Sequence, residues 1–472
     1  MVMRVLVLSL LVLALAWYFF FVYVPPGTII LRNDGFHPRV ITIKAGETVT
    51  FKTARTKYFW PASDFHPSHT LYSDFDPKVP VGPSESWTFT FTEAGTYPFH
   101  DHLAAFYSGM IRVQAVDGTV PDNCMERGGQ LRCWQNALFL SLAQKGVDAA
   151  FDSLTALYGA TPSFAASCHY LTHNLGLASY QFYKKDPSSV LSEKAVACAA
   201  GFYHGFMEGF LGATGDVEKA GAVCDRIGDK LGDKSPDARL QCYHGIGHGA
   251  VETAVVSAGA VNRPEDIVNE SIRMCEAASF GRDERYRCVS GAYNGVANFF
   301  ISDQYGFSFD SSDPRVLCAS QKDEYKEACY GELNSIAKIF AKGDFQKAAA
   351  YMLSIPDKDY RHEAIQYIGV IYALDHVADT SFEGVVRGCH ALPSEYRGDC
   401  LSGFRRGLFE HGAPGAEYQQ GFALCAEHSL TDAEQENCYK EGLSTLHGWY
   451  NKEKSAHICT TVPERYQKYC PL

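Results

Sequence analysis

The first 123 residues contain no cysteine, whereas all 16 cysteines lie between Cys124 and Cys470. None of them forms a Cys-x2-Cys pair, a spacing that thiol–disulfide exchange would require. In five pairs of neighbouring cysteines the two residues are separated by 10 to 12 others, whereas zinc sites favour cysteines two to four residues apart. The even count and the wide spacing therefore predict disulfide bonds, formed in an oxidising compartment.

Clustered basic residues are also absent, and the formal net charge is -12. A phosphate-binding surface needs grouped Lys and Arg, so we expect no nucleic-acid partner. Glycine-rich phosphate-binding loops and the motifs of Ser-His-Asp hydrolases are missing as well. The 46% of hydrophobic and 20% of charged residues are typical of folded protein.

Charged residues are missing from Val5 to Val24. About 20 apolar residues are long enough to cross a bilayer. A cleaved signal peptide is the alternative, but the aromatic end of this stretch offers no small-residue cleavage site. Because Arg4 precedes the stretch, the positive-inside rule places the N-terminus in the cytoplasm. We predict a transmembrane anchor at residues 1–24 of a single-pass cell-membrane protein, with all later residues extracytoplasmic.

Residues 25–118 alternate between apolar and polar side chains in short runs such as TIILRND, RVITIKAG, TVTFKT, SWTFTFTEAG and GMIRVQAV. Runs of this kind, separated by Gly, Pro and Asp, predict a small all-β antiparallel sandwich or barrel. A long segment rich in Pro and aromatic residues, from Lys57 to Ser86, should form a structured loop over one end.

The stretch FHPRVITIKAGETVTFKT, a histidine-containing loop, GTYPFH and GMIRV together resemble the cupredoxin superfamily, the plastocyanin-like copper-binding sandwiches. The resemblance covers about ninety residues. In that family a histidine after the third or fourth strand binds copper together with a cysteine, a second histidine and usually a methionine from a loop before the last strand. It implies that His69 is the first copper ligand.

The second ligand cluster departs from this family. Alignment of Tyr97, Phe99 and Gly109 with its pattern places Asp101 at the position of the copper-binding cysteine and Ala104 near the second histidine. Without a thiolate, the trigonal blue-copper site cannot form in its usual way.

The segment HDHLAAFYSGM is similar instead to the His-x-His segments of multicopper oxidases. His100 and His102 leave an extended strand on one side, and Asp101 points to the other. With His66 and His69 from the preceding loop they would form an all-nitrogen set, which suits Cu(II) in a non-blue site. The alternative is a polar pair of histidines hydrogen-bonded to loop carbonyls.

Acidic side chains near these histidines are candidates for an oxygen ligand or for acceptors that orient an imidazole. They are Asp64, Asp74, Asp76 and Asp101. His37, at the start of a strand, is expected to be structural.

Residues 119–472 have the pattern of an all-α domain with an internal repeat. A core of Cys-x2-Gly, often with another glycine four residues later, begins at Cys198, Cys242, Cys288 and Cys400. Variants of this core align at Cys329 and Cys438, and a cysteine-free version aligns at Ala364. Spacings of roughly 35 to 45 residues are typical of helical hairpins stacked into a solenoid or toroid. The diagnostic positions of tetratricopeptide repeats do not match, and the glycines predict close helix packing.

Consecutive cysteines in this domain are expected to pair across one turn between helices. The predicted pairs are Cys124–Cys133, Cys168–Cys198, Cys224–Cys242, Cys275–Cys288, Cys318–Cys329, Cys389–Cys400, Cys425–Cys438 and Cys459–Cys470.

Polar residues recur six and ten positions after the aligned cysteines, so that HGFME and HGAVE place a histidine and a glutamate on one face of two helices. His204, Glu208, His248 and Glu252 could bind zinc, iron or manganese there, as carboxylate bundles do. A hydrogen-bonded polar seam is the alternative.

The sequence thus predicts a multidomain, membrane-anchored extracytoplasmic protein. Its cupredoxin-like domain would bind copper for electron transfer or copper handling, and its disulfide-stapled helical repeat domain would bind a protein or redox partner. A metalloenzyme, either copper oxidase- or reductase-like or using the His/Glu site, is a second hypothesis. A metal-free binding scaffold is the third, and the sequence does not decide whether the protein is an enzyme.

Overall fold

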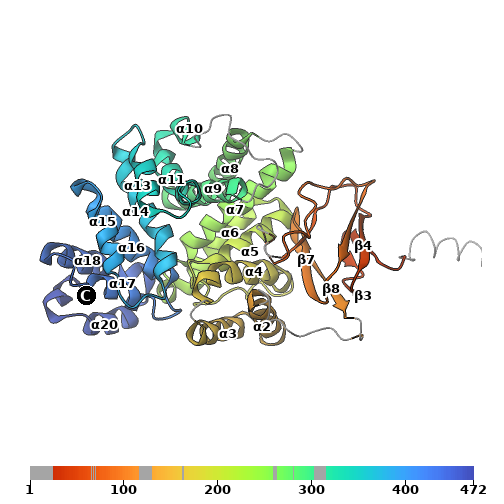
Figure 1. Cartoon of the computed structure of the whole chain (residues 1–472), viewed down its shortest axis with the longest axis horizontal. Helices are drawn as coiled ribbons and strands as arrows, with labels where there is room; N and C mark the ends of the chain where they lie inside the picture. Colours follow the sequence, from red (N-terminus) through yellow and green to blue (C-terminus); the bar gives the residue numbers. More distant parts are fainter. Residues whose placement is uncertain are drawn as a thin grey trace, which may run out of the picture. The chain divides into compact units, whose positions relative to one another are not determined.

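The computed structural model describes residues 25–64, 66, 69, 71–115, 118, 130–161, 164–258, 263–279, 281–301 and 315–471. They fall into two compact units, of which Figure 1 shows the elements. The sandwich unit lies within Met1–Asp64, His69–Leu103 and Tyr107–Asn123, and the helical unit within Phe65–Ser68, Ala104–Phe106 and Cys124–Leu472. The predicted anchor at residues 1–24 lies outside the described residues. Within the described ranges, no helix has the length and apolar character needed to cross a bilayer.

The sandwich unit consists of two four-stranded sheets. Its strands are β1 (Thr28–Arg32), β2 (Gly35–His37), β3 (Val40–Lys44), β4 (Glu47–Thr53), β5 (Pro61–Ser63), β6 (Ser86–Phe91), β7 (Gly95–Asp101) and β8 (Ala104–Gln114). The first sheet has the order β2-β1-β4-β6 and the second the order β3-β8-β7-β5. The alternating segments of the sequence therefore form the strands of a sandwich, as predicted.

The expectation of purely antiparallel pairing was wrong for two strand pairs. β1 pairs with β4 in parallel, and β3 pairs with β8 in parallel. The reason is topological, because the chain changes sheets between β2 and β3 and returns to the first sheet with β4.

Aromatic side chains fill the space between the two sheets. Phe51, Phe75 and Phe99 are fully buried, and the ring centroids of Phe51 and Phe99 lie 5.4 Å apart. Phe75 comes from the long segment between β4 and β6, where Phe59 also forms a bridge with Val81. Burial of these rings in the core fixes the predicted loop against the sandwich.

The helical unit contains α-helices and short 3₁₀-helices. The α-helices are α2 (Gln130–Lys145), α3 (Val147–Ala160), α4 (Ala165–Tyr183), α5 (Gly201–Thr214), α6 (Val217–Leu231), α7 (Ala238–Ala258), α8 (Pro264–Ala278), α9 (Arg282–Ile301), α10 (Val316–Ala319), α11 (Asp323–Glu332), α12 (Asn334–Phe340), α13 (Phe345–Leu353), α14 (Asp359–Ala373), α15 (Glu383–His390), α16 (Arg397–His411), α17 (Tyr418–Cys425), α18 (Asp432–Ser444), α19 (Leu446–Trp449) and α20 (Lys452–Thr461). The 3₁₀-helices are η2 (Gly232–Lys234), η3 (Leu374–His376), η4 (Ser394–Tyr396) and η5 (Glu464–Tyr469).

A ring of helices forms the centre of this unit. α4, α5, α7, α9, α11 with α12, α14 and α16 contact one another in this order, and α16 in turn contacts α4. The closure is also seen where the Ala199 amide donates to the Glu410 carbonyl at 2.8 Å. The repeat therefore curves into a closed ring, which is the toroid rather than the open solenoid of the two architectures expected.

Glycines of the repeat set the distance between neighbouring ring helices. A Cβ atom at Gly205 of α5 would lie 1.9 Å from the His173 carbonyl oxygen of α4, and one at Gly176 of α4 would lie 1.9 Å from the Phe202 oxygen. Gly291 of α9 meets the His244 carbonyl of α7 in the same way, at 1.9 Å. The prediction of close packing through glycine is therefore confirmed.

Seven of the predicted disulfides are present in the described residues. They are Cys168–Cys198, Cys224–Cys242, Cys275–Cys288, Cys318–Cys329, Cys389–Cys400, Cys425–Cys438 and Cys459–Cys470. The predicted Cys124–Cys133 pair involves a residue outside the described part. Because disulfide bonds form and persist in oxidising environments, seven of them indicate that the helical unit lies in an oxidising compartment.

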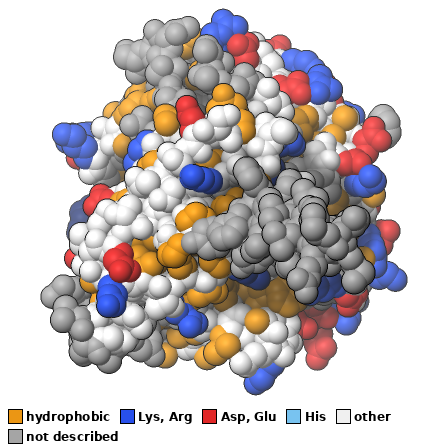
Figure 2. All heavy atoms as spheres, turned by 90° about the vertical axis from the view of Figure 1, so that its right-hand side faces the viewer, with side chains coloured by type: hydrophobic (Ala, Val, Ile, Leu, Met, Phe, Trp, Pro, Cys, Tyr) orange, Lys and Arg blue, Asp and Glu red, His pale blue; other side chains and the backbone are white. Residues whose placement is uncertain are grey.

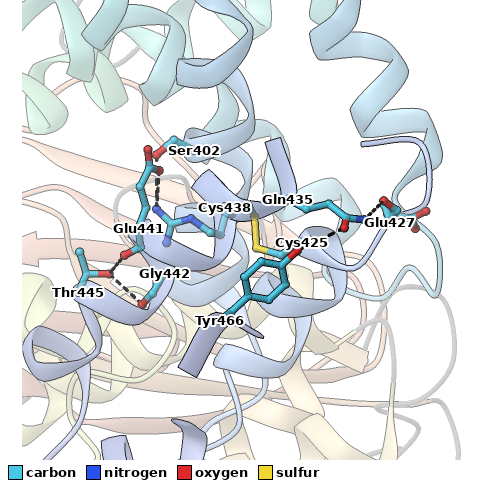
Figure 3. Close-up of a disulfide and its surroundings, with 10 residues drawn as sticks. Ser402, Cys425, Glu427, Gln435, Cys438, Glu441, Gly442, Thr445 and Tyr466 are labelled. Atoms are coloured by element: carbon cyan, nitrogen blue, oxygen red, sulfur yellow. Dashed lines mark hydrogen bonds and ion pairs between the residues drawn. A yellow bond between two sulfur atoms is a disulfide. The ribbon is translucent and has the colours of Figure 1, made fainter. Parts of the chain in front are cut away.

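Figure 3 shows how one disulfide is embedded in its surroundings. Cys425 at the end of α17 is bonded to Cys438 of α18, and Gln435 on the same helix donates to the Glu427 carbonyl at 3.0 Å. Arg405 of α16 donates to Glu441 of α18 at 3.3 Å. The disulfide and these polar contacts together hold α18 against the ring.

Candidate metal centres

Strand β7 ends within the His-Asp-His segment of the sandwich unit. His100 lies opposite Ala62 of β5, and the His102 amide donates to the Trp60 carbonyl at 2.7 Å. Both imidazoles are 2% exposed, and Asp101 is fully buried. Neither histidine is therefore a solvated surface residue.

Asp101 forms its hydrogen bonds with backbone amides and not with the neighbouring histidines. Its Oδ1 accepts from the Trp60 amide at 2.7 Å and from the Leu103 amide at 3.3 Å, and its Oδ2 lies 3.6 Å from Arg55 Nη1. Burial raises the pKa of Asp101 to about 6, although these donors and the Arg55 charge act against it. The residue at the expected thiolate position thus anchors the chain that precedes β5.

His69 is held by a second buried carboxylate. Its Nδ1 donates to Asp76 Oδ2 at 2.6 Å, and the Trp60 indole donates to Asp76 Oδ1 at 2.8 Å. Burial would raise the pKa of Asp76, but the hydrogen bond and charge of His69 and the contacts with Lys78 hold it well below its usual range. His69 itself has a φ of 52°, a left-handed conformation that is uncommon outside glycine and that often marks functional sites.

His100 has a similar carboxylate partner, because its Nδ1 donates to Asp64 Oδ1 at 2.8 Å. The Nε2 of His69 and the Nδ1 of His102 lie 2.9 Å apart. His69, His100 and His102, called the sandwich cluster below, each offer one nitrogen within 4.8 Å of the others. The predicted ligands of this unit therefore meet at one point, and His66 belongs to the helical unit, described next.

The other polar residues singled out near the cluster lie elsewhere. Asp74 is exposed. His37 is half-exposed and contacts Asp34 Oδ1 at 2.9 Å. Asp64 and Asp76 are the acidic residues that orient imidazoles.

The helical unit contains a cavity of about 410 Å³ in the middle of its ring. Side chains from α4, α5, α7, α9, α14 and α16 line it. Its histidines are His66, His169, His173, His204, His244, His248 and His411. The polar face predicted from the repeat thus lines this cavity, and His204, Glu208, His248 and Glu252 all lie on its wall.

Glu208 of α5 is the residue that most imidazoles approach. Its Oε1 lies 3.0 Å from His173 Nε2 of α4 and 3.5 Å from His248 Nδ1 of α7, and its Oε2 lies 3.8 Å from His66 Nε2. His66 also forms a short contact with the Glu252 carboxylate. Glu208 is 4% exposed, so one buried carboxylate faces three imidazoles.

A group of stacked imidazoles continues from Glu208 along the wall. The rings of His204 and His248 are nearly parallel, with centroids 4.5 Å apart, and the His204 and His244 centroids lie 4.9 Å apart. These three residues also offer nitrogens within 4.8 Å of one another.

Burial and neighbouring charges shift the pKa values of the histidines on this wall in opposite directions. Burial, reinforced by the neighbouring histidines, lowers the pKa of His204 well below its usual value, so its ring is neutral. Burial also opposes protonation of His173, but the charge of Glu208 outweighs it and raises the pKa of His173. Burial would raise the pKa of Glu208, and His173 reverses the direction and lowers it.

Further along the ring the wall carries hydrogen-bonded charged residues. Arg406 donates to Glu410 at 2.8 Å, and Asn294 donates to Glu332 at 2.9 Å. Burial raises the pKa of Glu332. Arg406 and Glu410 thus satisfy each other, as do Asn294 and Glu332, and neither pair includes a residue of the Glu208 group.

Sequence reasoning found four of these cavity residues through the repeat, and it placed His173 and His244 close to the same line of polar positions without naming them as ligands. The signal for His173 was present, because it precedes by one residue the repeat position that Asn174 occupies. His66 was expected only as a copper ligand, and its contacts with Glu208 and Glu252 depend on tertiary structure.

On the face seen in Figure 2, Lys and Arg side chains are interspersed with Asp and Glu side chains. No continuous basic area is visible there among the described residues.

Comparisons with known proteins yield structural matches alone. No protein-family model matches the chain, and no curated protein matches its sequence. Among solved structures, a reduced tryptophan-to-tyrosine mutant of amicyanin is 21% identical, with a TM-score of 0.17, and the match covers 19% of this chain and 86% of that one. The oxidised plastocyanin of the fern Dryopteris crassirhizoma is 20% identical, with a TM-score of 0.16 and coverage of 18% and 99%. Scores this low carry no argument about chemistry, which has to come from the site itself.

Proposed function

We propose that the sandwich unit binds one copper ion through His69, His100 and His102, in a non-blue site used for electron transfer or copper handling. The observation that carries this proposal is the pair of buried carboxylates on the Nδ1 atoms of His69 and His100. Ligating histidines almost always donate their other ring N–H to a carboxylate, a carbonyl or water, which fixes the ring and makes it a better ligand. Asp76 and Asp64 have this role here.

Distances within the sandwich cluster support the same proposal. Two imidazole nitrogens that bind one metal at about 2.0 Å with a right angle between them lie about 2.8 Å apart. The 2.9 Å between His69 Nε2 and His102 Nδ1 matches that value. A hydrogen bond from His102 to His69 gives the same distance, and copper binding distinguishes the two.

The donor chemistry favours copper without a thiolate. Three imidazoles suit Cu(II), and the sandwich sequence up to residue 123 has no cysteine to supply the sulfur of a blue site. Asp101, which takes the place of that cysteine, already accepts hydrogen bonds from the Trp60 and Leu103 amides through Oδ1. The three rings are at most 2% exposed, and such closure suits holding an ion more than binding a substrate.

Spectroscopy of the copper-loaded full-length chain tests this proposal. The EPR spectrum of the Cu(II) form should show nitrogen hyperfine coupling, without the strong blue absorption of a thiolate. His100→Ala/His102→Ala should lose this signal, and His37→Ala, which removes an exposed histidine of the same unit, should keep it. A blue thiolate band, or an unchanged spectrum in the double variant, would contradict the proposal.

The membrane anchor and the binding of a protein or redox partner by the helical unit stay predictions from the sequence.

A further inference from the structure

The cavity wall around Glu208 contains more polar atoms than its own hydrogen bonds satisfy. Both ring nitrogens of His204, Nδ1 of His173, Nε2 of His248 and Oε2 of Glu208 are buried without a hydrogen-bond partner in the described part of the chain. Native proteins contain only a few such atoms per hundred residues, because each loses its hydrogen bonds with water and gains none in return. Their concentration on one wall indicates that water or a polar ligand belongs in the cavity.

His204 gives the clearest sign of such a ligand. It is 5% exposed, and both of its ring nitrogens are buried without a hydrogen-bond partner in the described residues. An imidazole carries at least one N–H in either tautomer, so at least one donor here lacks an acceptor. Its neighbours His244 and His248 offer parallel or tilted ring faces, not hydrogen bonds. A polar seam closed by its own hydrogen bonds would not leave this ring unsatisfied.

The side chains around Glu208 have the donor atoms and the spacing of a metal site. His173 Nε2, Glu208 Oε1 and one nitrogen of His248 lie within 4.8 Å of one another, and the two measured distances to Oε1 are 3.0 and 3.5 Å. Ligands at about 2.0–2.2 Å from one ion, with angles between a right angle and a tetrahedral one, are separated by about 2.8–3.6 Å. Two imidazoles and one carboxylate are the donor set of mononuclear iron(II) sites and are common around zinc.

We propose that His173, Glu208 and His248 bind one divalent first-row transition metal, iron(II) or zinc(II), at the wall of the helical cavity. The three ligands come from the consecutive ring helices α4, α5 and α7. Gly176 and Gly205 set the spacing of α4 and α5, and Gly245 sets that of α5 and α7. The protein supplies three ligands, so the remaining coordination positions of the ion are open, as in catalytic rather than structural sites. This inference does not depend on copper in the sandwich unit.

Metal binding by the full-length chain in the His100→Ala/His102→Ala background tests the site separately from the sandwich cluster. The metal-free protein is dialysed against zinc(II), or against iron(II) without oxygen, and metal per chain is measured by mass spectrometry. We expect about one ion per chain, and at least a hundredfold weaker binding after Glu208→Gln, which is nearly isosteric. His362→Ala, a half-exposed histidine of the same unit that pairs with Asp399, should bind as the parent does.

A thermal melt guards against loss of the fold in the variants. Zinc or iron should raise the melting temperature of the parent and of His362→Ala, and should leave that of Glu208→Gln and of His173→Ala unchanged. The proposal is overturned if the parent retains no metal and shows no shift, or if Glu208→Gln retains the ion with unchanged affinity. Retention of zinc but not iron, or the reverse, assigns the metal.

Discussion

His100 donates from Nδ1 to Asp64 Oδ1 at 2.8 Å, and both residues are buried in the sandwich unit. A carboxylate in this position holds the ring in one tautomer and strengthens its other nitrogen as a ligand. Asp64→Asn should therefore weaken copper binding about 10–100-fold without removing a ligand. Competition with a chelator of known affinity measures the change.

Asp74→Asn is the matched control for that prediction. It makes the same chemical change at an exposed position of the same loop and should leave copper affinity unaltered. Equal affinities for Asp64→Asn and Asp74→Asn would show that the hydrogen bond to His100 has no part in metal binding.

Asp101 should matter for stability and not for copper. Asp101→Ala leaves the Trp60 amide without its acceptor and Arg55 without its carboxylate, which should cost about 1–3 kcal/mol in the free energy of unfolding. Asp101→Asn keeps an acceptor oxygen and should cost less. Denaturant unfolding and copper content are measured together, and loss of copper from a folded Asp101→Asn protein would make Asp101 a ligand after all.

Gly205 positions the ligands of the helical cavity through backbone contact. A Cβ there would lie 1.9 Å from the His173 carbonyl, so Gly205→Ala should push α4 from α5 and destabilise the protein by about 1–3 kcal/mol or more. Gly398→Ala, on the exposed side of α16 with nothing within 4 Å, should be neutral or stabilising by up to about 1 kcal/mol. Thermal unfolding of the two variants compares them, and equal melting temperatures would refute the packing argument.

The disulfides should contribute through the unfolded state. Replacing both residues of Cys275–Cys288 with alanine opens a loop with a sequence separation of 13 and should cost about 3 kcal/mol. Chemical denaturation under oxidising conditions measures the loss. In the presence of a reductant that opens all the disulfides, the difference between parent and variant should disappear, and its persistence would point to lost packing instead.

Much of this fold could be predicted because strand alternation and cysteine spacing can be recognised within short stretches of the sequence. Strands such as Val40–Lys44 alternate with period two, and cysteine pairs such as Cys318–Cys329 close a single turn between two helices. Pairing across the sandwich was not local, so the parallel alignment of β1 with β4 and of β3 with β8 was missed.

The candidate sites divide in the same way. His100 and His102 were identifiable from a spacing of two along one strand, and His204 and Glu208 from a spacing of four along one helix. The grouping of Glu208 with His173 and the attachment of Asp101 to the Trp60 amide depend on which elements pack together. Closure of the ring, which brings α16 against α4, could not be predicted because it joins the two ends of the repeat array and no single repeat carries a signal for it.

Copper content of the purified full-length protein tests the central claim most directly. The protein is loaded with copper, loosely held metal is removed, and copper per chain is measured by mass spectrometry for the parent, His100→Ala/His102→Ala and His37→Ala. The sandwich site predicts that the double variant holds one copper ion fewer per chain than the other two. Equal copper content in all three proteins would contradict it.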